Sequence, residues 1–276
     1  MSGSRWPHLL APLRLGALAL QHRVVLPALS LGLAEEGRPG SALAGHHLAR
    51  ASPGGLQISA ALAVSPWLHH DPGSSGLYCA AQVNPWRDIS RALQQQGGLL
   101  VAQLGQPLAA DRALSPRQLD TALDDYRNAA ENAGDAGFDA IELLAAHGAL
   151  PARLLRDGEL ALLEELLAML VGLWGASRIG LCLERGALPV DLPLAPLAYV
   201  HLAAPWPPLP GNGPRPDAFE APAARPPCPL LVSGGFAPQS AERLLAGGRA
   251  DAIGFGRAFL DRPALVQQLR QSDRSS

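Results

Sequence analysis

Leu230–Gly235 (LLVSGG) and Ala250–Arg257 (ADAIGFGR) are the stretches that decide the fold of this chain. Each is a short apolar strand that ends in glycine and opens onto a helix. Glycine at a strand tip lets backbone N–H groups approach a ligand closely, and a helix N-terminus behind it favours an anion. The guanidinium of Arg257 suits phosphate oxygens. Two such turns predict the phosphate site that (β/α)8 barrels build after strands seven and eight. Two ordinary turns with a surface arginine are the simpler alternative.

Short β-like runs alternate with helical patterns along the rest of the chain, which is typical of βα units and a parallel sheet. The expected strands are Val24–Ala28, Leu56–Ala63, Leu99–Gln103, Ala140–Leu144, Ile179–Leu183, Tyr199–Leu202, Leu230–Ser233 and Ala252–Gly254. Eight strands are the number that closes such a barrel. We therefore predict an α/β fold, a (β/α)8 TIM barrel that occupies residues 1–276 as a single domain.

Helices fit between most of these strands. The clearest begins at Ser115, where Pro116 and Gln118 complete a capping box. The other expected helices are Pro85–Gln96, Ala152–Trp174, Ser240–Ala246 and Pro263–Arg270. The segment 186–229 holds 13 of the 26 prolines, which leaves little room for helices. We expect this segment to be irregular, with short turns near Leu192–Leu197 and Asp217–Ala221 and with irregular or missing helices around strands five to seven.

The charge pattern excludes several classes of function. The 276 residues carry a formal net charge of −2 and no basic stripe, so no nucleic-acid partner is expected. All 22 basic side chains are arginine. Schiff-base chemistry and the P-loop lysine are therefore excluded. The sequence leaves open whether the chain forms a homo-oligomer.

The cysteines and histidines predict neither a disulfide framework nor a metal site. Cys79, Cys182 and Cys228 are sparse and widely spaced, which fits a reducing compartment. The histidines at 46–47 and 69–70 are adjacent pairs without a third ligand at metal spacing. The N-terminus has no signal-peptide pattern, and the longest apolar run, Leu160–Trp174, is too short to span a bilayer. We expect a cytoplasmic protein with no membrane partner.

Several stretches in fixed order resemble the old yellow enzyme family of FMN-dependent oxidoreductases, which are (β/α)8 barrels. The similar stretches are Leu10–Val25, Gly54–Ser59, Gly97–Leu104, Asn132–Glu142 and the two glycine-containing stretches described above. The correspondence runs in register from about Leu9 to Arg270, with two apparent deletions. The chain thus resembles a shortened and divergent member of that family.

The resemblance implies a site for non-covalent FMN. The residues that end strand one would lie under the flavin, and a small residue after strand two would let that strand approach the ring. A glutamine would bond the pyrimidine edge with its amide, and the C-terminal glycines and arginine would hold the phosphate. The residues at these positions are Pro27, Ala28, Leu29, Ser30, Ala61, Gln103, Gly234, Gly235, Gly256 and Arg257.

The positions that are catalytic in the family are less well preserved in this sequence. Of two histidines after strand four, only His147 remains; Leu144 replaces the other, and Ala149 replaces a tyrosine. Cys182 stands where the family has an arginine beside the flavin, and Arg178 or Arg185 could supply that charge instead. The loop after strand four is reduced to residues 153–158. His147 is therefore the one catalytic residue that we predict.

The resemblance implies hydride transfer from NADH or NADPH through flavin N5 to an electron-poor small molecule, such as an α,β-unsaturated carbonyl compound. A second hypothesis is a catalytically degenerate barrel, with or without FMN, that serves in binding or in non-redox proton transfer. A third is a flavin-free barrel that holds a phosphorylated metabolite; Gln103 argues against it, because such a ligand needs no pyrimidine partner.

Overall fold

The computed structural model describes residues 4–68, 71, 73–108, 115–186, 197–204 and 225–274. Eight parallel strands close into a barrel in chain order, so the predicted fold class is confirmed. The strands are β3 (Val24–Leu26), β6 (Leu56–Ile58), β7 (Leu99–Leu104), β8 (Ala140–Ala145), β9 (Ile179–Glu184), β10 (Tyr199–Ala203), β11 (Leu230–Ser233) and β12 (Ala252–Gly254).

Two strand predictions were too long, because β3 and β6 end early. The prediction carried β6 to Ala63, but after Ile58 the chain keeps only isolated bridges, such as Leu62 with Leu104. Ser59 is still bonded to β7, through its N–H to the Val101 carbonyl 2.9 Å away. The apolar run continues past the ladder because Ala61, Leu62 and Ala63 are still buried.

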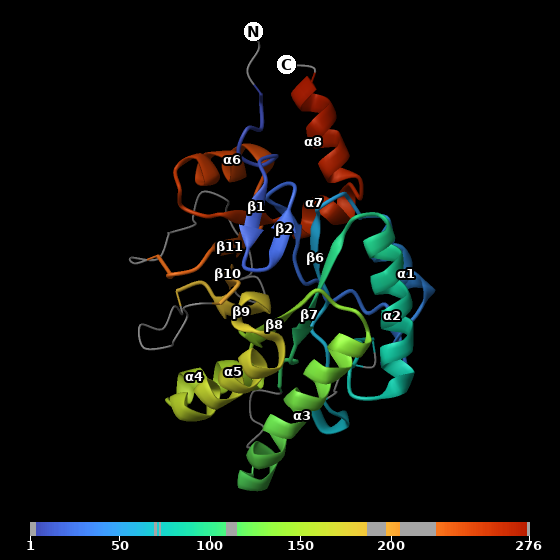
Figure 1. Ribbon diagram of the computed structural model, residues 1–276, viewed down its shortest axis with the longest axis vertical. Helices are drawn as coiled ribbons and strands as arrows, with labels where there is room; N and C mark the ends of the chain where they lie inside the picture. The colour runs from blue at the N-terminus through green and yellow to red at the C-terminus, as the bar shows by residue number, and fades with distance from the viewer. Residues whose placement is uncertain are drawn as a thin grey trace, which may run out of the picture.

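The helices pack on the outside of the barrel (Figure 1) and bury an apolar layer against it. They are α1 (Ser41–Leu48), α2 (Ala80–Gln95), α3 (Pro116–Asp135), α4 (Leu150–Asp157), α5 (Leu160–Trp174), α6 (Pro238–Ala246), α7 (Gly256–Asp261) and α8 (Leu265–Arg274), with 3-10 turns η1 (Pro66–Leu68) and η2 (Ala176–Arg178). Within the described residues between β9 and β11 there is no helix. The predicted turns near 192–197 and 217–221 lie outside the described residues, apart from Leu197.

Local signals explain which helix boundaries the sequence predicted. The capping box at Ser115 is present, with both of its reciprocal hydrogen bonds to Gln118. The single helix predicted over Ala152–Trp174 is wrong, because Gly158 adopts a left-handed conformation (φ 81°) that ends α4 before α5 begins. The predicted loop over residues 153–158 is also wrong, because most of these residues belong to α4.

An antiparallel hairpin, β1 (Leu13–Leu15) with β2 (Leu18–Leu20), closes the end of the barrel where the strands begin. Its leucines share a buried cluster with inward-facing barrel residues such as Ile58, Val101 and Leu231. A second hairpin, β4 (Ala34–Glu35) with β5 (Arg38–Pro39), follows β3. Because this apolar hairpin closes one end of the barrel, a ligand can approach the interior only from the opposite end.

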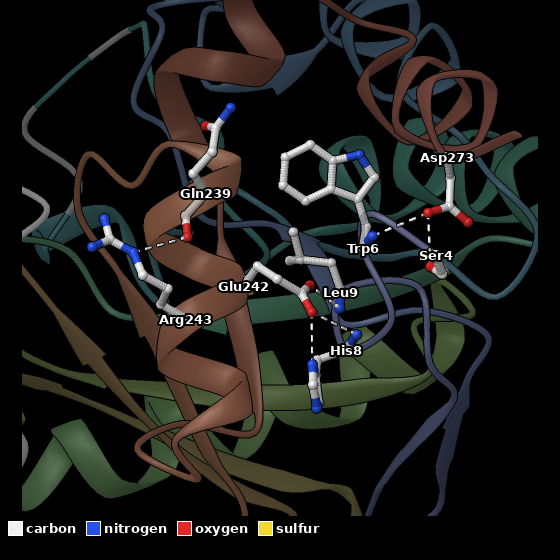
Figure 2. Close-up of polar contacts among 8 residues, drawn as sticks. All are labelled: Ser4, Trp6, His8, Leu9, Gln239, Glu242, Arg243 and Asp273. Atoms are coloured by element: carbon white, nitrogen blue, oxygen red, sulfur yellow. Dashed lines mark hydrogen bonds and ion pairs between the residues drawn. The ribbon is translucent and has the colours of Figure 1, made fainter. Parts of the chain in front are cut away.

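The N-terminal segment is held against two C-terminal helices (Figure 2). The Glu242 carboxylate on α6 accepts from the backbone N–H groups of His8 and Leu9, each at 2.9 Å, and lies 2.6 Å from His8 Nδ1. Asp273 on α8 accepts from Ser4 Oγ at 2.7 Å and from Trp6 N–H at 3.0 Å. These contacts join the two ends of the chain. In the part of the chain that is described, no helix is long and apolar enough to cross a membrane.

Candidate active site

The two glycine turns predicted from the sequence lie side by side. β11 pairs with β12, with Ser233 opposite Gly254, and β12 pairs with β3. Gly234 (φ 131°) and Gly235 (φ 78°) form the turn after β11, and Gly256 begins α7 after β12. Parallel strands all end at the same edge, so both turns face the barrel mouth.

The residues that follow β3 pack against these turns. A Cβ atom on Gly254 would lie 3.2 Å from the Pro27 Cβ, and one on Gly256 would lie 3.0 Å from a methyl group of Leu29. Ala28 is half-buried and Ser30 is exposed. Glycine is thus required here because neighbouring strands approach closely.

Two guanidinium groups lie near the glycine turns, in different settings. Arg257 is exposed on the first turn of α7. Arg185, which follows β9, is half-buried and donates through Nη2 to the carbonyls of Ser233, at 2.7 Å, and Gly234, at 3.3 Å. Burial lowers the pKa of Arg185, but a guanidinium remains charged in proteins. The mouth therefore carries at least these two positive charges.

Arg178 cannot replace the arginine that the resemblance places at position 182. It lies in η2, before the first residue of β9, and donates to the Asp139 carbonyl at 2.8 Å. Its exposed side chain is therefore at the plugged end of the barrel, so this prediction was wrong. Arg185, at the other end of the same strand, is the arginine of that pair that reaches the mouth.

His147 lies just after β8 and is held by the end of the next strand. Its backbone is left-handed (φ 55°), a conformation that is uncommon outside glycine. Its N–H donates to Glu184 Oε1 at 2.8 Å, and its Nδ1 lies 3.6 Å from the same oxygen. Burial lowers the pKa of the imidazole, although Glu184 acts in the opposite sense. At neutral pH we therefore expect an uncharged ring that offers one donor.

Small apolar side chains surround the top of the barrel interior. This upper apolar layer consists of Ala61, Leu144, Ala146, Ala149, Cys182 and Ala203, all buried. Three of its members (Leu144, Ala149 and Cys182) occupy positions where the resemblance implies polar groups. The layer can pack against the face of a flat ring but offers it few hydrogen bonds.

A chain of buried polar side chains lies beneath this layer. Gln103 Nε2 donates to Glu142 Oε1 at 2.6 Å, and Glu142 Oε2 lies 3.0 Å from His201 Nδ1. His201 Nε2 lies 2.8 Å from Ser233 Oγ, which links the chain to the glycine turn after β11. The amide nitrogen of Gln103 is therefore held by the protein interior. We call Gln103, Glu142, His201 and Ser233 the interior polar chain.

Sequence reasoning missed Glu142, and it assigned no function to His201. Both lie at inward positions, which alternate along each strand, on β8 and β10. Glu142 is fully buried, and one of its carboxyl oxygens, Cys182 Sγ and a His201 ring nitrogen all lie within 4.8 Å of one another. These three side chains could hold a metal ion. An acidic residue inside a strand of apolar neighbours was the signal that could have indicated this site.

A cavity of about 330 Å³ lies elsewhere, between the segment 48–53 and α8. None of the predicted site residues lines it.

Comparisons with known proteins agree on one family. The profile of the NADH:flavin oxidoreductase / NADH oxidase family matches residues 8–107. The chain is 27% identical to 12-oxophytodienoate reductase 1 of Oryza sativa subsp. japonica, over 97% of this chain and 89% of that protein. It is 25% identical to flavin oxidoreductase hxnT of Emericella nidulans, over 95% and 90%.

Solved structures of similar proteins share the fold. The old yellow enzyme homologue from Zymomonas mobilis has a TM-score of 0.80 at 24% identity, covering 96% of this chain and 93% of that one. Morphinone reductase in complex with tetrahydroNAD gives 0.80 at 24% identity, over 97% and 91%. A variant of the Zymomonas mobilis protein gives 0.78 at 27% identity, over 97% and 92%.

Proposed function

We propose that this chain, a shortened and divergent member of the old yellow enzyme family, is an FMN-dependent oxidoreductase in the cytoplasm. Its reductant would be NADH or NADPH, and its substrate an electron-poor small molecule such as an α,β-unsaturated carbonyl compound. The observation that carries the proposal is the adjacency of the two glycine turns on β11 and β12, with Arg257 beside them.

The donors at this end of the barrel fit a phosphate. Gly234, Gly235 and Gly256 present backbone N–H groups without side chains that would block them. Arg257 makes no ion pair among the described residues, so its guanidinium group remains available for phosphate oxygens. Arg185 sits next to Gly234 and adds a second cation.

The residues proposed to contact the flavin ring differ in how well they suit it. Pro27–Ser30 follow β3 directly beside the glycine turns, where the flavin would lie against them. Ala61 belongs to the upper apolar layer, which fits a flat ring by contact. Gln103 is less suited to the pyrimidine edge than the sequence indicates, because its Nε2 already donates to Glu142.

The bound FMN would supply hydride transfer between the nicotinamide and the substrate. His147 would orient the substrate by donating a ring N–H to its carbonyl oxygen, which withdraws electron density from the reacting carbon. Glu184 fixes the loop that presents this ring, through its bond to the His147 N–H. A single donor fixes the carbonyl direction less well than two would.

The second hypothesis, a catalytically degenerate barrel, is favoured by one specific observation. Leu144 and Cys182 are fully buried in the upper apolar layer and supply no charge or strong donor there. Such a protein would still bind the phosphate group but would no longer catalyse hydride transfer.

The experiment is to purify the full-length chain, measure its FMN content and assay turnover of cyclohexenone with NADH and NADPH. We expect stoichiometric FMN, or reconstitution by added FMN, together with enone-dependent oxidation of the nicotinamide. A protein that binds FMN without turnover of any electron-poor alkene in a broad set would favour the degenerate hypothesis. A chain that cannot be reconstituted with FMN would contradict both the oxidoreductase proposal and a degenerate barrel that still binds FMN.

A further inference from the structure

We propose that Glu142, Cys182 and His201 form a binding site for a Zn²⁺-like divalent cation inside the barrel. The three side chains come from the neighbouring strands β8, β9 and β10 and are at most 2% exposed. One ligand atom from each lies within 4.8 Å of the other two. The inference concerns the protein interior and does not depend on FMN.

Two of these atoms are spaced nearly as ligands on a metal are, and the third, Cys182 Sγ, lies within 4.8 Å of both. Ligand atoms at 2.0–2.3 Å from a tetrahedral Zn²⁺ lie roughly 3.3–3.7 Å apart. Glu142 Oε2 and His201 Nδ1 are 3.0 Å apart. A small adjustment would therefore replace their mutual hydrogen bond with two bonds to the metal.

The outer contacts of a metal site are already in place. Gln103 Nε2 donates to Glu142 Oε1, the oxygen that His201 does not contact, at 2.6 Å. Ser233 Oγ lies 2.8 Å from His201 Nε2, the ring nitrogen that would not bind the metal. Metal-binding histidines commonly donate from their second nitrogen to such a partner, which fixes the tautomer and the ring orientation.

The electrostatics of the interior favour a cation at this place. A fully buried carboxylate is costly unless a charge or several donors offset it. The described ion pairs give Glu142 only His201 as a partner, and Arg185 is bonded to the strand-end carbonyls instead. A divalent ion would supply positive charge where the resemblance places an arginine, at the position of Cys182.

Cys182 and Tyr199 fit the same interpretation. Cys182 is fully buried on β9, between β8 and β10, and a thiol that coordinates a metal ion is deprotonated, so it would bind the ion as a thiolate. The Tyr199 hydroxyl, also on β10, is buried without a hydrogen-bond partner among the described residues. One thiolate, one imidazole and one carboxylate are ligands that suit Zn²⁺.

The test uses cobalt as the probe, because thiolate-bound Co²⁺ has a charge-transfer band in the near ultraviolet. Since the site is sealed, the metal must enter during folding. The full-length chain is therefore produced in minimal medium with Co²⁺ and, in parallel, with Zn²⁺. We expect one metal ion per chain by elemental analysis and a thiolate-to-cobalt band.

The matched variants are Cys182→Ala and His201→Gln, with Cys79→Ala and Cys228→Ala as controls. The first two should reduce cobalt to background and abolish the band, and the controls should keep both. A wild-type chain without metal, or a Cys182→Ala chain with undiminished cobalt, would overturn the proposal. Circular dichroism shows whether each variant folds. FMN content, measured on the same samples, tests the proposed function separately.

Discussion

Arg257 and Arg185 lie at the same end of the barrel but are engaged differently. Arg185 is bonded to strand-end carbonyls, whereas Arg257 is exposed. The sequence identified Arg257 because its motif is local: glycine and arginine are adjacent at the start of a helix. It left Arg178 and Arg185 open, and the structure decides between them because Arg185 follows the C-terminal end of β9, which is the end at the mouth.

Arg257→Ala should weaken FMN binding about 10–100-fold, because one charge-assisted contact contributes about 1.5–3 kcal/mol. Arg262→Ala is the matched control, since Arg262 is equally exposed but follows the last residue of α7, whereas Arg257 is on its first turn. Equilibrium dialysis of FMN measures both. Equal affinity in the two variants would show that the phosphate binds elsewhere.

Buried histidines should make stability depend on pH. Burial lowers the pKa of His22 and of His47 from 6.5 to about 4. Between these pH values the unfolded chain binds protons that the folded chain does not, so stability falls as the pH decreases. The loss should be about 2 kcal/mol for each histidine between pH 7 and pH 5.

Urea denaturation at pH 7 and pH 5 measures this loss, with His47→Gln as the comparison. The variant's own packing cost appears at both pH values, so the difference between them isolates the titration. A pH dependence as steep in His47→Gln as in the natural chain would disprove the assignment.

Among the elements, those with local signals were predicted best. The capping box of α3 depends on residues three positions apart, and the runs of β11 and β12 are bounded by glycine. The α4–α5 break was missed because a long apolar pattern hides one glycine. The β1–β2 hairpin was missed because three-residue strands have too little alternation to recognise.

Gly16→Ala should destabilise the protein by more than about 2 kcal/mol, since it combines backbone strain with a clash. Gly16 has a φ of 57° in the turn of the β1–β2 hairpin, and an added Cβ would lie too close to the Ser177 carbonyl oxygen. Gly32 has a φ of 64° but open space around it. Gly32→Ala should therefore cost only about 1 kcal/mol. Thermal unfolding compares them; equal losses would mean that the hairpin does not pack as described.

At the scale of the whole molecule, closure of the barrel creates the sites. Glu142, Cys182 and His201 are separated by 40 and 19 residues in the sequence, yet meet in the interior. No spacing rule for metal ligands covers such distances. The sequence therefore predicted the fold and the neighbouring glycine turns of β11 and β12. It did not predict the interior polar chain, because inward orientation and strand stagger are known only after closure.

Glu242→Ala should reduce the free energy of unfolding by about 2–3 kcal/mol, because it removes a charged acceptor of two backbone N–H groups. These bonds hold His8 and Leu9 against α6 (Figure 2). Glu164→Ala, at an exposed position on α5, is the control and should change little. Chemical denaturation measures both, and an unchanged midpoint for Glu242→Ala would mean that the N-terminal segment adds nothing to stability.

Anaerobic titration of the FMN-loaded chain with NADH and with NADPH decides whether this barrel carries out flavin chemistry. We expect one of the two nicotinamides to bleach the visible flavin absorbance and an added α,β-unsaturated carbonyl compound to restore it. A chain that holds FMN but whose spectrum neither nicotinamide changes would disprove the proposed oxidoreductase function.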